Sequence, residues 1–234
     1  MPKLKPETQR ARREQILNAA EACFTRAGFH QTTMQDICTE AKLSAGALYA
    51  HFNSKEDLIC GIVRRETAAF AERLSAAATD AKSFLDALRD VAEHYTIHEP
   101  REKNRLFMEI GTEATRHAAV NETFRELNTA ILANLTSQIA MAKANGQVGS
   151  KLPPETIATL IGILGDGLCW RRATDPDFDA SALLPPVLDI IAGILEPIGT
   201  DGPHGEHAYS ARLSAVAPND QAEPLTKLAE KETA

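Results

Sequence analysis

Apolar residues recur every three or four positions over most of this chain, and that spacing restricts the fold to helices. Between residues 10 and 27, for example, it places Ile16, Ala20, Cys23 and Phe24 on one stripe of a helix. The alternation of apolar and polar residues that is typical of strands is not found, and nothing repeats at a fixed period. We therefore expect an all-α fold.

Helix-capping residues divide the pattern into segments. Gly28 stands where a left-handed C-cap belongs, Thr33 and Asp36 form a capping-box pattern, and Ser44 and Ser54 each precede a new helix. The expected helices are 10–27, 33–40, 44–49, 54–77, 82–98, 101–114, 121–145, 154–172 and 180–197, with a short one near 224–232.

These segments predict two domains and a tail. Residues 1–53 form a small helix-turn-helix domain with a basic N-terminal arm, and residues 54–198 form a larger helical domain, with the helix from residue 54 as connector. Residues 199–234 are rich in Gly and Pro and are expected to be a disordered tail.

Charge is distributed unevenly between these parts. The whole chain has a net charge of −7, but residues 1–65 carry 10 Lys or Arg against 7 Asp or Glu. The rest carries 15 basic and 25 acidic residues, so that a basic head precedes an acidic body. This asymmetry favours a nucleic-acid contact at the head.

Other functional classes have little support in the sequence. No apolar stretch predicts a signal peptide or a membrane-spanning helix, and we expect no membrane partner. Cysteines 23, 38, 60 and 169 form no CxxC pair, which favours reduced thiols in a cytoplasmic protein. No nucleophile elbow, Gly-rich phosphate loop or zinc pattern is found, so that no enzymatic activity and no cofactor are expected.

Residues 29–59 read FHQTTMQDICTEAKLSAGALYAHFNSKEDLI. A short helix, a tight turn and a second short helix over 33–50 are typical of a helix-turn-helix, although the spacing alone is weak evidence. The run also contains a Phe-x-x-Thr-Thr entry, a Leu-Tyr-x-His-Phe helix end and a Ser-Lys-Glu-Asp-Leu connector opening. It closely resembles the signature of the TetR family of transcriptional regulators, without a gap from Ile16 to Leu58.

The resemblance implies a DNA-contact set. The Thr33 hydroxyl and backbone N–H are expected to contact a phosphate at a helix N-terminus. Tyr49, His51 and Lys55 are expected to contact phosphates as well, whereas the start of the recognition helix faces the bases. The complete set, with Gln35 and Lys42 as further candidates, is Thr33, Gln35, Lys42, Ser44, Ala45, Gly46, Ala47, Tyr49, His51 and Lys55. Leu48 and Phe52 are interpreted as core.

Two positions depart from the family pattern. Ala45 stands where similar proteins often have Lys, Arg or Pro, and Lys42 stands where they often have Gly. A recognition helix that begins Ala45-Gly46-Ala47 offers few hydrogen-bond donors to base edges. Thymine methyl contacts, backbone contacts and DNA shape are therefore expected to carry much of the specificity.

The last two long helices are expected to form a homodimer interface. Residues 157–168 and 183–195 each carry an apolar face, and the second is wider than one core contact requires. A twofold dimer buries such surface and matches a palindromic operator. The alternative is a bundle packed entirely within one chain.

The resemblance also implies an inducer site in the larger domain, for a small amphipathic or aromatic molecule. Asp166 is conspicuous there, because it interrupts an apolar run and must find a hydrogen-bond donor or reach solvent. Plain core is the alternative for each apolar candidate. The candidates are Phe70, Leu74, Phe84, Leu88, Tyr95, Phe107, Met108, Ile110, Phe124, Leu127, Ile131, Leu135, Asp166 and Trp170.

The leading hypothesis is therefore a ligand-responsive repressor that binds double-stranded DNA as a homodimer. A helical enzyme, or a ligand-binding or scaffolding protein that has lost DNA binding, are the alternatives, and salt-dependent binding to duplex DNA distinguishes them. His94 and His98 have a spacing that suits a metal, but no protease pattern surrounds them and no metal site is expected.

Overall fold

The computed structural model describes residues 6–80 and 83–197. The expected tail and its short helix near 224–232 lie outside these residues. All regular elements of the described ranges are helices, and the one β-bridge, between Val148 and Pro197, is isolated. The elements are α1 Pro6–Ala27, α2 Met34–Ala41, α3 Ala45–Tyr49, α4 Lys55–Asp80, α5 Phe84–Glu93, η1 His94–His98, α6 Arg101–Ala114, α7 Ala118–Ala144, α8 Pro154–Thr174 and α9 Ala180–Leu195. The all-α prediction is confirmed.

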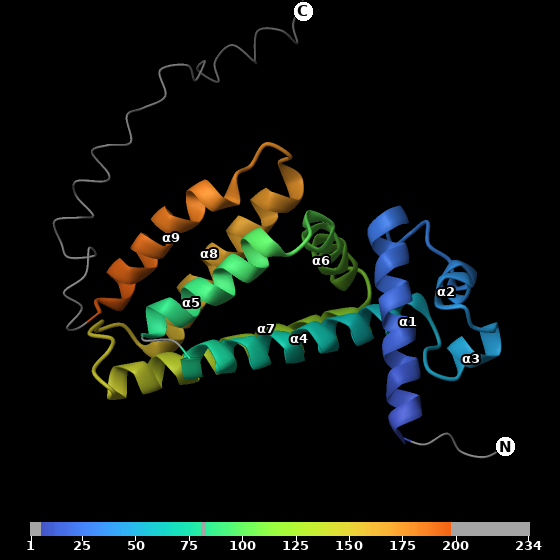
Figure 1. The fold of residues 1–234 in the computed structure, drawn as a ribbon, viewed down its shortest axis with the longest axis horizontal. Helices are drawn as coiled ribbons and strands as arrows, with labels where there is room; N and C mark the ends of the chain where they lie inside the picture. The colour runs from blue at the N-terminus through green and yellow to red at the C-terminus, as the bar shows by residue number, and fades with distance from the viewer. Residues whose placement is uncertain (1–5, 81–82, 198–234) are drawn as a thin grey trace, which may run out of the picture. The chain divides into compact units, whose positions relative to one another are not determined.

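We call the three N-terminal helices α1, α2 and α3 the head, and helices α5–α9 the body (Figure 1). Gly28 ends α1 with φ +79°, a left-handed conformation that glycine adopts without steric strain. Helix α1 passes between α6 on one side and α2 and α3 on the other (Figure 1). The Gln15 side chain donates to the Ala41 carbonyl at 2.7 Å and ties α1 to the end of α2.

The long helix α4 connects the head to the body. Its first turn packs under α1, and most of its length runs beside α7 (Figure 1). At Gly61 the backbone of α4 lies close to side chains of the head: a Cβ there would lie 2.7 Å from Leu17 Cδ2 and 2.9 Å from Phe52 Cε1. The structure extends this helix to Asp80, slightly beyond the predicted end.

The predicted helix over 82–98 is regular only as far as Glu93. From His94 to His98 the backbone is a π-helix, in which the Glu99 N–H donates to the His94 carbonyl at 2.9 Å, five residues back. Arg172 of α8 donates to the carbonyls of Ile97 and Glu99 and so satisfies groups that a helix end leaves unpaired. Apolar periodicity does not distinguish a π-helical turn from an α-helical one, so the π-helix was not predicted.

Two hydrophobic clusters fill the described unit. The first joins α1–α4 to α6 and α7, with Ile16, Phe24, Leu48 and Phe52 at its centre. The second joins the far part of α4 to α5, α7, α8 and α9. The first cluster crosses the predicted domain boundary at residue 53, because α4 and α6 supply side chains to the core of the head. The boundary itself stays a prediction.

Candidate nucleic-acid interface

Local capping sets the geometry of α2 and α3. Thr33 caps α2 in a full capping box with Asp36, and the Ser44 hydroxyl accepts the Ala47 N–H at 3.3 Å. Between them Lys42 ends α2 with φ 54° and ψ 44°, the left-handed conformation. The family preference for glycine at this position therefore has a steric cause, since a side chain disfavours this conformation.

Buried and exposed side chains separate cleanly across the two helices. Ile37, Leu48 and Phe52 are buried in the first cluster, which confirms the core interpretation of Leu48 and Phe52. The predicted base-facing residues 44–46 are exposed, and Ala47 is half-buried. Gln35 and Lys42 are also exposed. The structure thus brings the predicted DNA contacts of α2 and α3 to the solvent side of the head.

Tyr49 and His51 lie at the end of α3. Tyr49 is 49% exposed although it is a large aromatic residue, whereas His51 is half-buried. A phenol held in solvent at the end of the recognition helix can donate to a phosphate oxygen.

Thr33 is engaged within the protein. Its hydroxyl and its backbone N–H both donate to Asp36 Oδ2, at 2.7 and 2.9 Å. These two hydrogen bonds, the hydroxyl first, lower the pKa of the Asp36 carboxyl below its ordinary value. Both donors that the resemblance assigned to a phosphate therefore already serve the cap, and the Asp36 carboxylate stands beside the expected phosphate site.

Lys55 is likewise directed at the protein. Its Nζ donates to the Phe29 carbonyl at 2.7 Å and lies 4.5 Å from the centroid of the Phe29 ring. This contact was not predicted, because 26 residues separate the two partners.

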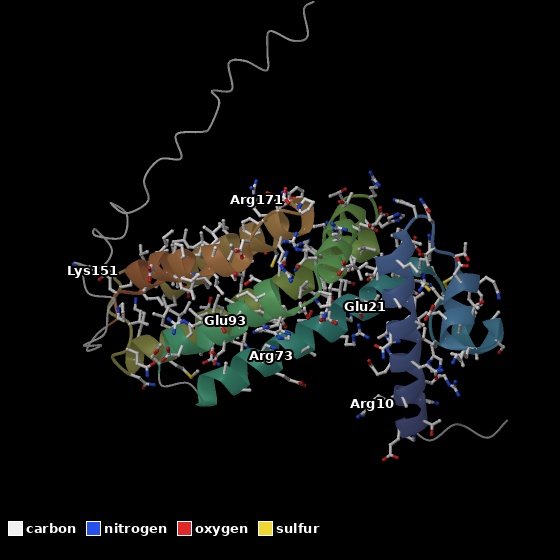
Figure 2. All side chains as sticks on the ribbon, turned by 45° about the horizontal axis from the view of Figure 1, so that its top comes forward. Arg10, Glu21, Arg73, Glu93, Lys151 and Arg171 are labelled. Carbon is white, nitrogen blue, oxygen red and sulfur yellow. The ribbon has the colours of Figure 1, made fainter. Side chains whose placement is uncertain are left out.

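Basic residues of α1 add to the charge of the head. Arg13 stacks over the Phe52 ring at 4.3 Å, and Arg12 donates to Gln15 at 3.1 Å. Arg10 lies nearer the N-terminal end of α1 than Glu21, which sits where α1 crosses α4 and accepts a hydrogen bond from Arg65 (Figure 2). The Glu21–Arg65 ion pair thus joins α1 to α4.

The predicted inducer-lining residues fall into several groups in the described part of the chain. Leu74, Phe84 and Leu88 are buried in the second cluster, with Phe70 and Tyr95 packed against it. Leu127 belongs to the first cluster, and Phe124 and Ile131 pack against it. Phe107 and Met108 are half-buried on α6. Trp170 is 56% exposed on α8.

One cavity of about 350 Å³ lies elsewhere in the body, between η1, the α8–α9 loop and the start of α9. Its lining includes Arg101, Arg172 and Phe178, and none of the predicted residues. Arg101 donates to the carbonyls of Asp175 and Phe178, so it shapes the loop that forms one wall.

Asp166 faces solvent on α8 rather than a donor. Although its side chain is exposed, the surrounding protein desolvates the carboxylate and raises its pKa. Within the described ranges no three His, Cys, Asp or Glu side chains gather as metal ligands. His94 faces Glu99 at 3.6 Å, while His98 is exposed.

Comparison with known proteins identifies the helix-turn-helix segment. Residues 16–60 match the model of a family described as bacterial regulatory proteins, tetR family. That match covers the second half of α1, all of α2 and α3, and the first turns of α4, and so includes the surface of α2 and α3 described above. Residues 16–60 of this chain therefore carry a helix-turn-helix of the TetR type.

Individual proteins are similar to this chain over most of its length. The HTH-type transcriptional repressor Rv1474c of Mycobacterium tuberculosis is 25% identical over 193 residues, which are 82% of this chain and 96% of that protein. Salmonella enterica GusR superposes with a TM-score of 0.67 at 28% identity and covers 83% of this chain and 100% of that one. SmeT, solved as a triclosan complex, has a TM-score of 0.65 at 24% identity, with 82% and 93% covered.

The described part of the chain is thus all-α, and the helix-turn-helix that matches the TetR family lies near its N-terminal end. In the described part of the chain, no helix combines the length and the apolar character needed to cross a membrane.

Proposed function

We propose that this protein is a ligand-responsive repressor that binds a palindromic operator as a homodimer and is released by a small amphipathic or aromatic inducer. The observation that carries the proposal is the solvent-facing surface of α2 and α3. There the predicted base contacts at residues 44–46 are exposed, whereas Leu48 and Phe52, which follow them in the chain, are buried.

The exposed surface favours a particular division of contacts. Ala45, Gly46 and Ala47 present a small, apolar helix start that can approach thymine methyl groups and the groove floor closely. Tyr49, His51 and Lys42 are the proposed phosphate contacts, together with N–H groups at the start of α2. Because phosphate contacts carry no sequence information directly, these three position the helix, and DNA shape contributes to the choice of site.

The homodimer is supported by one apolar face on α8 and α9. Ile163 and Trp170 are 60% and 56% exposed on α8, and Leu183 and Ile190 are 41% and 40% exposed on α9. Each pair is seven residues apart and so lies on one side of its helix. The two helices pack against each other, and we take the four side chains together as the proposed interface, because exposed apolar surface marks sites of association.

The inducer is proposed to bind in the body. SmeT, which shares the fold, was solved with triclosan, and the body of this chain has aromatic side chains at Phe70, Phe84 and Tyr95. Release follows if the inducer binds more tightly to a dimer whose heads no longer match the operator spacing. The affinity for DNA then falls by the difference between the two binding energies.

To test this, the full-length protein is first used to select duplexes from the DNA that flanks its gene. Its affinity for the selected duplexes is then measured by fluorescence anisotropy at two salt concentrations. Specific binding that weakens steeply with salt is expected. Tyr49→Phe should weaken binding by a similar factor on all duplexes, roughly tenfold for the loss of one phosphate hydrogen bond. Binding that does not depend on salt, or no binding to any selected duplex, would contradict the proposal.

A further inference from the structure

The loop that joins α1 to α2, residues 28–32, is fixed internally at both ends. The Thr32 hydroxyl is buried and lies 2.8 Å from the Gly28 carbonyl and 3.2 Å from the Cys23 carbonyl. Between them the Phe29 ring is buried, with its centroid 5.5 Å from that of Phe24. Since Thr33 follows directly and caps α2, the path of this loop sets where α2 begins.

Helix α4 holds the outer side of this loop through Lys55. The ammonium nitrogen lies 2.7 Å from the Phe29 carbonyl oxygen and 3.4 Å from that of His30, and it sits 4.5 Å from the centre of the Phe29 ring. Two carbonyl acceptors and an aromatic face together provide the environment that an ammonium group needs away from bulk water.

Helix α6 holds the same loop from the body. Glu109 Oε2 accepts the Phe29 N–H at 2.9 Å, although 80 residues separate the two. One turn further along α6, the buried carboxylate of Glu113 lies 3.0 Å from His30 Nε2. The backbone of Phe29 is therefore gripped at both polar groups, at its carbonyl by α4 and at its N–H by α6.

We infer that Lys55 and Glu109 are positioning residues for DNA binding, which clamp the Phe29 backbone and so fix α2, and that Lys55 does not itself bind a phosphate. The inference rests on the proposed function for its DNA readout. It replaces the phosphate contact that the family resemblance implied for Lys55, and it assigns a role to Glu109, which the sequence did not single out.

The salt dependence of DNA binding distinguishes a clamp from a phosphate contact. A lysine that neutralises a phosphate contributes about one to the slope of log affinity against log salt, whereas a positioning residue leaves the slope unchanged. Lys42 supplies the matched control, because it is an exposed lysine in the turn between α2 and α3. Lys55→Met and Lys42→Gln each remove one positive charge from the head.

For Lys55→Met we expect about tenfold weaker binding to the selected duplex, an unchanged slope and a melting temperature lower by about 3–6 °C. For Lys42→Gln we expect a slope reduced by about one per protomer and an unchanged melting temperature. A slope that falls in Lys55→Met by as much as in Lys42→Gln would overturn the inference.

Variants of Glu109 provide an independent test of the clamp, which can be carried out even if Lys55→Met does not fold. Glu109→Gln keeps an oxygen that can accept the Phe29 N–H and should bind DNA as the wild type does, whereas Glu109→Leu should lose about as much affinity as Lys55→Met. Amide hydrogen exchange at Phe29 should be faster in Glu109→Leu and unchanged in Glu109→Gln. Wild-type affinity and wild-type Phe29 exchange in Glu109→Leu would overturn the clamp.

The two arms also separate this inference from the proposed function. If the wild-type protein binds no duplex, the proposed function fails. Phe29 exchange and the melting temperatures still test the clamp in that case. If the wild type binds DNA and the variants behave like it, the clamp fails alone.

Discussion

Lys42 shows how a single residue can carry a conformational penalty in the middle of the DNA-binding motif. It ends α2 at φ 54°, where a residue with a Cβ is disfavoured and glycine is not. Lys42→Gly should therefore raise the free energy of unfolding by about 0.5–1 kcal/mol, as measured by urea denaturation. Lys42→Ala is the control and should bring no such gain, because alanine keeps the Cβ. Equal stability of the two variants would refute the steric account.

Asp36 links the stability of α2 to pH. The hydrogen bonds from Thr33 lower its pKa in the folded state, so the ionised form is the one that the fold favours. Its contribution is then fully present above the ordinary pKa of 3.8 and is lost as the pH falls through the lower, folded pKa.

We therefore expect wild type to be more stable than Asp36→Asn at about pH 7 and this difference to shrink below about pH 4. Urea unfolding of both proteins across that range measures it. A difference that stays constant down to about pH 2 would show that the carboxyl does not titrate in this way.

Capping residues were predictable from the sequence and long-range partners were not. Thr33, Asp36 and Ser44 act on atoms three residues away, and that distance is visible in the sequence. Lys55 and Glu109 act on Phe29 across 26 and 80 residues, and only the packing of α4 and α6 against the loop brings them there.

At the scale of elements, the crossing of α4 with α1 and the α3 end depends on Gly61. A Cβ at this position would come within 3.0 Å of Leu17 and Phe52, both almost fully buried and unable to move aside freely. Gly61→Ala should lower the free energy of unfolding by about 1–3 kcal/mol, despite the better helix propensity of alanine.

Gly46→Ala is the matched control, since a Cβ at Gly46 would meet no atom within 4 Å. It should leave stability unchanged or raise it by up to about 1 kcal/mol. Urea midpoints of the two variants test the pair, and a Gly61→Ala protein as stable as Gly46→Ala would show that the crossing is loosely packed.

Helix existence and order followed from apolar periodicity, with ends correct to within a few residues. The π-helix at His94–His98 did not, because it depends on one extra residue per turn and on Arg172 of a distant helix. The inducer-lining set stays a prediction, because apolar periodicity does not place these side chains relative to one another. Aromatic composition does not say which of Phe124 and Phe84 joins which cluster, and the fold assigns them to different ones.

At the scale of the whole molecule, the proposed homodimer depends on the exposed apolar face of α8 and α9. Ile163→Glu combined with Trp170→Glu places two charges on that face, and each buried unpaired charge is strongly unfavourable. We expect the wild type to sediment as a dimer and the double variant as a monomer.

Met141→Glu is the control, because Met141 is equally exposed, at 50%, but lies on α7, outside that face. It should remain dimeric. A wild-type monomer at micromolar concentration would contradict the proposed homodimer, and dissociation by Met141→Glu would place the interface elsewhere.

The hydrophobic cluster that crosses residue 53 has a consequence for protein engineering. Helices α4 and α6 complete the core around α1–α3 with Leu58, Ile62, Leu106 and Ile110. The core of the head therefore includes side chains from outside residues 1–53. A chimera that exchanges only residues 1–53 between two relatives would pair mismatched halves of one core. The smallest DNA-binding segment that can be exchanged between relatives therefore includes α4 and α6. New DNA specificities are better made by substituting the exposed residues of α3 within the intact protein.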